Sequence, residues 1–182
     1  MRILTLLLIT LLCANSSFSQ ERIIKQHGIT KVETQITNTR KPEKSFKLVQ
    51  TYGKKGKLLE EIKTNYKGEI VEHNKYWYDN YKKTVIKYDN LGNEIAKEVT
   101  IKNKDGKTIE TSSENYLKKL KSGRKYTYDK WGKLRSEIWL NNIGEIERTK
   151  NYEYNDEGLL IKQTSLDETN SVIFEKEIHY ED

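Results

Sequence analysis

The sequence predicts an all-β protein, a long antiparallel meander of about 11–12 strands. Two observations predict this class. Short turn motifs that end in glycine recur along most of the chain, about a dozen positions apart or at near-doubles of that interval. Between the motifs, apolar and polar side chains alternate as they do in a β-strand. Such intervals hold one strand and a tight connection, and they leave no space for crossover helices.

The segment from Met1 to Ser19 has the composition of a secretory signal peptide. Arg2 precedes an apolar run over residues 3–12, and small residues flank Phe18. The run is too short to span a bilayer. Cleavage after Ser19 would leave a single β-repeat domain at residues 20–182. The predicted location is therefore secreted, periplasmic or at the cell surface.

The chain has one cysteine, Cys13, which lies inside the predicted signal. Its alternative role is a lipid-anchored N-terminus. Lipoprotein signals usually place a small residue before the cysteine, whereas Leu12 stands there. Simple cleavage near Ser19 is therefore preferred, and the mature domain would contain no disulfide and no thiol ligand for a metal.

Seven tetrapeptides carry the repeat, and six of them begin with Asn or Asp. An Asn or Asp side chain can accept hydrogen bonds from the backbone two residues on, which favours a tight turn. Glycine in the last position tolerates the positive φ that closes a hairpin with a bulge. The predicted structural turn residues are Gly56, Gly68, Asp89, Gly92, Gly106, Asp129, Gly132, Gly144 and Gly158.

Two intervals between glycines are nearly twice as long as the others, which indicates a turn without the motif in each. In the first, Lys82 is predicted to occupy the glycine position. The second turn is expected within residues 117–123. An N-terminal strand is predicted at residues 29–36, a connection around Pro42, and a last loop at residues 167–170.

A sheet of this many strands must curl, because wide open sheets are uncommon beyond ~10 strands. The predicted shape is a curled sheet, half-barrel or spiral, with one face apolar enough to be buried. Stability would then be distributed over contacts between neighbouring strands. The chain has 12 tyrosines, whose rings can cover a pleated surface while their hydroxyl groups stay in water.

The motif of Tyr88-Asp89 to Gly92 and of Tyr128-Asp129 to Gly132 resembles the YD repeat of the Rhs family of bacterial surface and toxin-carrying proteins. The resemblance extends over about residues 52–160. It implies a spiralling β-sheet in an exported protein, although this array is far too short to enclose a toxin. The N-terminal segment, with Phe18-Ser19 before Gln20, also resembles exported proteins of the Bacteroidetes.

The sequence offers little for catalysis, so we predict a protein that is not an enzyme, with no catalytic residues and no cofactor. Its histidines, His27, His73 and His179, lie far apart, and no metal site is predicted. Asp89 and Asp129 are explained by turn chemistry. A glycan-acting enzyme is the alternative, and it would need two carboxylates about 5–10 Å apart in a concave site.

The formal charge of +6 comes from 33 basic and 27 acidic residues that are mixed along the chain. Lysine clusters lie mostly beside turns, where they also protect strand edges from pairing with other chains. We predict no nucleic-acid partner and no transmembrane segment. A weak attraction to anionic surfaces is the expected consequence of the charge.

Three tryptophans, Trp77, Trp131 and Trp139, are the candidate binding residues. Trp131 lies at a central turn position, where an exposed ring can stack on a sugar or anchor a protein. The expected function is a secreted, non-enzymatic protein that presents a sheet surface to an unknown protein or glycan partner or to the cell envelope. An accessory or immunity-like protein of a polymorphic toxin system is the alternative.

Overall fold

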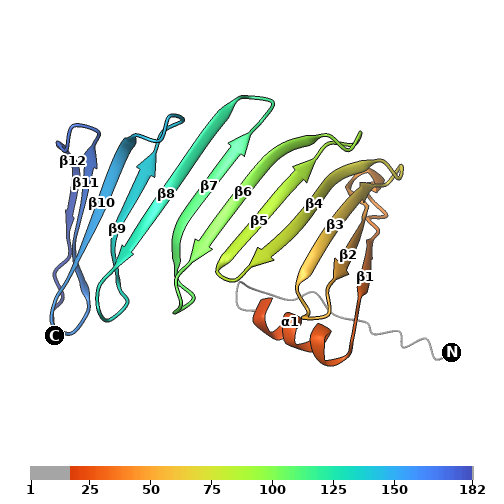
Figure 1. Cartoon of the computed structure of the whole chain (residues 1–182), viewed down its shortest axis with the longest axis horizontal. Coiled ribbons are helices and arrows are strands. Elements are labelled where there is room, and N and C mark those ends of the chain that lie inside the picture. The colour runs from red at the N-terminus through yellow and green to blue at the C-terminus, as the bar shows by residue number, and fades with distance from the viewer. Residues whose placement is uncertain (1–16, 182) are drawn as a thin grey trace.

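The computed structural model describes residues 17–181, and twelve β-strands within them form one antiparallel sheet. Strand order follows the chain from β1 to β12, so consecutive strands are neighbours (Figure 1). The first and last strands each pair with one strand only, which leaves the sheet open. The predicted all-β meander is confirmed.

The strands are β1 (Lys31–Ile36), β2 (Phe46–Tyr52), β3 (Leu58–Asn65), β4 (Ile70–Asp79), β5 (Lys82–Tyr88), β6 (Glu94–Lys102), β7 (Thr108–Asn115), β8 (Leu120–Tyr128), β9 (Leu134–Leu140), β10 (Ile146–Tyr154), β11 (Leu160–Asp167) and β12 (Val172–Glu177). Helix α1 (Ser17–Gln26) precedes β1, and a 3-10 turn (Pro42–Lys44) connects β1 to β2. The N-terminal strand and the connection around Pro42 lie where they were predicted.

The turn prediction is confirmed at all seven glycines that end the motif. Their φ angles lie between +78° and +86°. In each turn the glycine N–H donates to the carbonyl three residues earlier, which closes a type I turn with a glycine bulge. Asp89 shows the role of the first residue: its Oδ1 accepts the N–H groups of Leu91 at 2.9 Å and Asn93 at 2.8 Å. Hydrogen bonds, first from the Asn93 side chain, lower the pKa of Asp89.

The two turns without the motif differ from their predictions. Lys82 lies in β5 opposite Asp79, and a two-residue turn precedes it, with φ +42° at Asn80. The prediction that Lys82 replaces a glycine is therefore wrong. Asn visits the left-handed region more readily than most residues, so this hairpin closes without a bulge. In the second interval the turn ends at Lys119, with φ +53°, and Gly123 lies inside β8.

Helix α1 was not predicted from the sequence. It lies against the β2–β3 turn, since a Cβ on Gly56 would come within 2.5 Å of the Glu21 carbonyl oxygen. Its Ile24 is 3% exposed and covers part of the sheet that would otherwise face water. The predicted signal peptide lies mostly outside the described residues, and the predicted cleavage after Ser19 falls within this helix.

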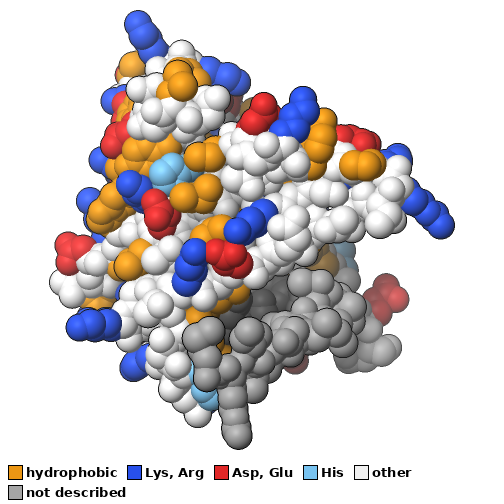
Figure 2. Space-filling model, turned by 90° about the vertical axis from the view of Figure 1, so that its right-hand side faces the viewer, with side chains coloured by type: hydrophobic (Ala, Val, Ile, Leu, Met, Phe, Trp, Pro, Cys, Tyr) orange, Lys and Arg blue, Asp and Glu red, His pale blue; other side chains and the backbone are white. Residues whose placement is uncertain are grey.

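The sheet forms a single layer without an enclosed core. Among the described residues only Ile24 and Tyr52 are buried hydrophobic side chains, and no side chain is fully buried. Figure 2, a view toward the β1 side of the molecule, shows hydrophobic side chains interspersed with charged ones. Contacts between neighbouring strands therefore supply the stability, as in other repeat proteins.

The strand register divides the apolar side chains between both faces, which corrects the prediction of one apolar face. One face, here the tyrosine face, carries the rings of Tyr52, Tyr76, Tyr78, Tyr126, Tyr128, Trp139, Tyr152 and Tyr154. The other, the aliphatic face, carries Ile62, Trp77, Ile86, Val99, Ile101, Ile138, Leu140 and Leu166. With no second layer to cover them, both faces are made of side chains that tolerate partial exposure.

Candidate functional site

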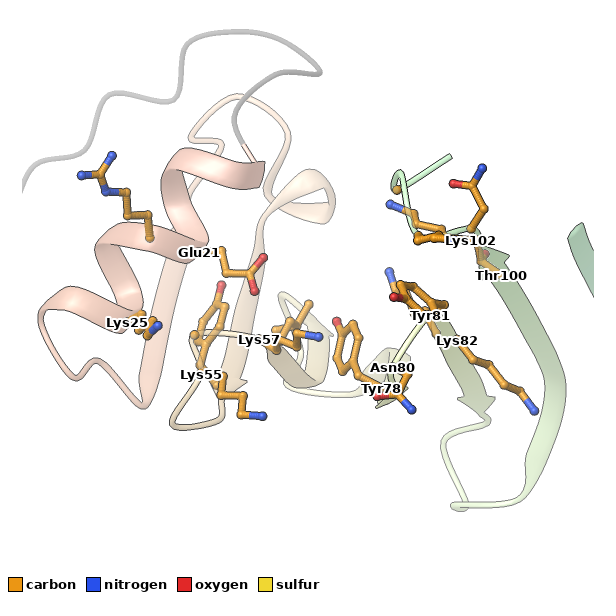
Figure 3. Close-up of a pocket in the computed structure, with 18 of the residues that line it drawn as sticks. Glu21, Lys25, Lys55, Lys57, Tyr78, Asn80, Tyr81, Lys82, Thr100 and Lys102 are labelled. Carbon is orange, nitrogen blue, oxygen red and sulfur yellow. The ribbon is translucent and has the colours of Figure 1, made fainter. Parts of the chain in front are cut away.

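Two neighbouring hollows lie at the end of the sheet that carries α1, which we call the helix end. The first has a volume of about 850 Å³ and lies between α1 and the turns that join β2 to β3, β4 to β5 and β6 to β7 (Figure 3). The second, of about 500 Å³, lies between the β6–β7 and β8–β9 turns. Asn103 lines both hollows, so together they form one surface, the turn-end groove.

Turn geometry determines which side chains project into the groove. In the β8–β9 turn, Asp129 Oδ1 accepts the N–H of Trp131 at 2.9 Å and of Lys133 at 2.8 Å. The Asp129 side chain thereby stabilises the backbone of the turn, and the indole of Trp131 is 74% exposed. The first and last turn positions thus fix the backbone, and the two between them face water.

Successive hairpins at the helix end are joined by lysines that follow a turn glycine. Lys107 Nζ donates to the Gly132 carbonyl at 2.5 Å and lies 5.3 Å from the ring centre of Tyr128. The hydroxyl of Tyr128 donates to the Thr108 carbonyl at 2.7 Å. We call this arrangement the lysine–tyrosine clamp.

The clamp recurs along the sheet. Lys133 lies 5.3 Å from the ring centre of Tyr154, whose hydroxyl donates to the Leu134 carbonyl at 3.0 Å. Lys57 lies 4.7 Å from the ring centre of Tyr78. The interval along the chain from the lysine to its tyrosine is the same in all three pairs. The hydroxyls of Tyr128 and Tyr154 bond to protein, which corrects the expectation that the tyrosine hydroxyls stay in water.

The first hollow is strongly cationic. Its lining includes one carboxylate, that of Glu21, and eight basic side chains: Arg22, Lys25, Lys55, Lys57, Lys82, Lys83, Lys102 and Lys104. None of the eight takes part in a salt bridge between described residues. Lysines away from the hollow differ: Lys87, for example, lies 2.7 Å from Glu98. The groove therefore concentrates positive charge that no salt bridge among residues 17–181 neutralises.

Tyr52 and Tyr78 form the floor of the first hollow. Burial raises the pKa of Tyr52, with a smaller contribution from the charge of Glu61. Burial also raises the pKa of Tyr78, assisted by the charge of Glu21. The hydroxyl of Tyr52 donates to Gln50 Oε1 at 3.1 Å, so it is already bonded within the protein. Tyr81, in the β4–β5 turn, is 55% exposed at the same hollow.

The structure does not bring the three candidate tryptophans together. Trp131 lines the second hollow. Trp139 lies on the tyrosine face between two cations, with Arg124 at 5.4 Å and Lys150 at 4.9 Å from its ring. Trp77 is 46% exposed on the aliphatic face. Only Trp131 therefore belongs to the groove.

Outside the groove, His73 pairs with a glutamate on the neighbouring strand. His73 Nε2 lies 2.9 Å from Glu60 Oε1, and its ring lies 5.0 Å from that of Tyr88. No group of three His, Cys, Asp or Glu side chains within residues 17–181 is placed to hold a metal ion. In the same part of the chain, no helix is long and apolar enough to cross a membrane.

Most of the groove was not predicted from the sequence. The lysine clusters that include Lys55 and Lys82 were interpreted as solvated charge beside turns, and Lys104 was not part of any predicted cluster. The constant interval between a lysine that follows glycine and a later tyrosine was a signal that could have revealed the clamp. No comparable local signal marks the contribution of α1.

The groove and the single-layer sheet define a class, an open β-repeat protein with its candidate site at the turns. No family model matches the chain, and no curated protein matches it. Among solved structures it is similar to a porin-like protein from Bacteroides uniformis, with 12% identity and a TM-score of 0.40 over 80% of this chain and 57% of that one. The chain thus spans little more than half of that protein.

A second similar structure is a protein of unknown function from Bacteroides fragilis. It has 14% identity and a TM-score of 0.23, over 84% of this chain and 96% of that chain. Both of these structures are Bacteroides proteins.

Proposed function

We propose that this protein is an exported, non-catalytic binding protein that presents the turn-end groove to a partner or a component of the cell envelope. One observation carries the proposal: a single-layer sheet leaves an open groove beside an indole that is 74% exposed. Large exposed aromatic rings at concave surfaces are typical binding residues.

The carboxylates of the groove support binding rather than hydrolysis. Asp129 accepts two backbone N–H groups within its own turn. Asp105 lies 3.5 Å from the Asn103 side chain in the neighbouring turn. Glycoside hydrolysis needs a free acid and a second carboxylate across the bond to be cleaved. The first hollow contributes only Glu21.

The N-terminal sequence supports the export part of the proposal. The hairpin motif supports the likeness to YD-repeat proteins. Cleavage after Ser19 would retain Glu21, Ile24 and Lys25, the residues through which α1 contributes to the fold and the groove. Intact-mass measurement of the exported protein tests the predicted cleavage. The mass of a chain that begins at Gln20 supports it, and the mass of a chain with a lipid on Cys13 contradicts it.

Glycan-array binding of the wild-type protein and of Trp131→Ala tests the binding role. Loss of an aromatic anchor typically weakens binding about 10-fold or more. Leu91→Ala is the matched control, because Leu91 has the same turn position and is 81% exposed at the opposite end of the sheet. Absence of binding to every glycan, or equal binding by Trp131→Ala, would contradict the proposal.

A further inference from the structure

We infer that the first hollow of the turn-end groove binds a linear acidic polysaccharide, one that carries carboxylate groups at regular intervals. This inference rests on the proposed binding function and specifies its ligand class. It is carried by the unpaired charge, the spacing of the turns and the aromatic floor of the hollow.

The charge of the hollow differs from that of the rest of the molecule. Nine salt-bridge contacts join side chains of the described residues elsewhere, and most of them link neighbouring strands. The eight cations of the hollow face one carboxylate, so their mutual repulsion is a cost that an anionic ligand would remove. Carboxylates of the ligand would pair with these cations, as glutamates pair with lysines elsewhere in the sheet.

The arrangement of the cations favours a polymer over a small anion. Lys55, Lys82 and Lys104 belong to three successive hairpins of the helix end. Alternate strand connections lie about 10 Å apart, which is twice the distance between paired strands. The three lysines are therefore distributed along the end of the sheet instead of converging on one point. Figure 3 shows this separation for Lys55 and Lys82. A linear chain with repeated charges can engage them in succession, whereas a single phosphate or carboxylate cannot.

The aromatic rings favour a glycan among the linear polyanions. Tyr52, Tyr78 and Tyr81 line the same hollow as the lysines. Lys57 lies over the Tyr78 ring, which fixes the position of one ammonium group before any ligand binds. The exposed ring of Tyr81 beside ammonium groups suits a sugar ring that carries a carboxylate, because such a sugar has an apolar face and one charged substituent.

The test compares two variants with the same loss of charge. The groove variant replaces Lys55, Lys82, Lys102 and Lys104 by Gln, and the control variant replaces Lys41, Lys44, Lys67 and Lys118 by Gln. All eight side chains are exposed, and the control residues lie at the opposite end of the sheet. Each variant lowers the formal charge from +6 to +2. Thermal unfolding monitored by circular dichroism verifies that both are folded.

Binding is measured by calorimetry with polygalacturonate as the carboxylated probe and dextran as the neutral one. The wild type should bind polygalacturonate and not dextran. The groove variant should bind about three-fold more weakly per lysine, or tens of fold in total, and the control variant should differ by less than three-fold. Raising the salt from 0.1 to 1 M should weaken wild-type binding strongly, because the screening length falls from about 10 to about 3 Å.

Four outcomes would overturn the inference. Equal losses in both variants would mean that net charge alone attracts the polymer. No binding of polygalacturonate would exclude the ligand class, and tighter binding of single-stranded DNA than of polygalacturonate would assign the groove to nucleic acid instead. If Trp131→Ala abolishes glycan binding while the groove variant does not, this inference fails and the proposed function stands. The converse result would refute the role of Trp131 and retain the cationic site.

Discussion

Replacing Gly132 by Ala should destabilise the protein more than the same change at Gly144. Both glycines end a turn motif, with φ of +81° and +86°. A Cβ at position 144 would meet no atom within 4 Å, whereas a Cβ at position 132 would overlap the ammonium group of Lys107. Backbone strain lowers the stability of both variants, whereas loss of the lysine–tyrosine clamp lowers only that of Gly132→Ala. Comparing the two variants therefore separates the two contributions.

The magnitudes follow from the contacts that are lost. A non-glycine residue in the left-handed region costs about 1–2 kcal/mol, and this applies at both positions. Lys107 can move away from the new Cβ, but it then loses its hydrogen bond to the Gly132 carbonyl and its place over Tyr128. These contacts contribute about 1 kcal/mol and about 0.5–1 kcal/mol. Gly132→Ala should therefore cost about 2.5–4 kcal/mol in total.

Urea denaturation of both variants, in the wild-type background and with Lys107→Met, measures these differences as a double-mutant cycle. In the Lys107→Met background the two glycine variants should lose similar amounts of stability, because no clamp remains to be broken. Equal losses in the wild-type background would refute the clamp. An excess loss at Gly132 that persists without Lys107 would show that another contact is responsible.

Two further predictions concern the turn without glycine and the tyrosine face. Asn80→Gly should stabilise the protein by about 0.5–1 kcal/mol, because glycine relieves the positive φ at this position. Lys82→Gly should destabilise it, because Lys82 lies in a strand. Urea denaturation measures both changes in stability, and the opposite order would contradict the turn assignment. Burial, assisted by the charge of Glu61, raises the pKa of Tyr76 from 10 to about 12. Unfolded chains then lose this proton first, so stability should fall as the pH rises from about 10 to 12. Thermal unfolding across this range should show a smaller fall in Tyr76→Phe, and an unchanged fall would contradict the assignment.

The sequence was sufficient to predict the features that depend on local chemistry. The turn at Asp89 is determined by an acceptor and a glycine three residues apart, and each of the seven motifs closes in the same way. Strand direction and order follow, because connections this short can only join antiparallel neighbours. The turn at Asn80 was placed correctly, but its type was not, because the choice between a two-residue turn and a bulge depends on which residue accepts the positive φ.

The features that could not be predicted depend on contacts between segments distant in sequence. Helix α1 lies against the β2–β3 turn, and its own sequence has one well-buried residue, Ile24. The groove exists because every second turn lies at the same end, which brings Lys55 beside the β4–β5 and β6–β7 turns. Prediction of this neighbourhood requires the register of the whole meander.

The separate roles of the residues within each turn explain how such a sheet can acquire a binding surface without losing stability. The first residue and the glycine fix the backbone, while the two residues between them are exposed in all seven motifs. These pairs are 54–55, 66–67, 90–91, 104–105, 130–131, 142–143 and 156–157. Because the pairs lie outside the strands and the clamp, their side chains can vary at little cost to folding. The pairs at the helix end include Lys55, Lys104 and Trp131, so the residues that distinguish the groove occupy positions that the fold leaves free.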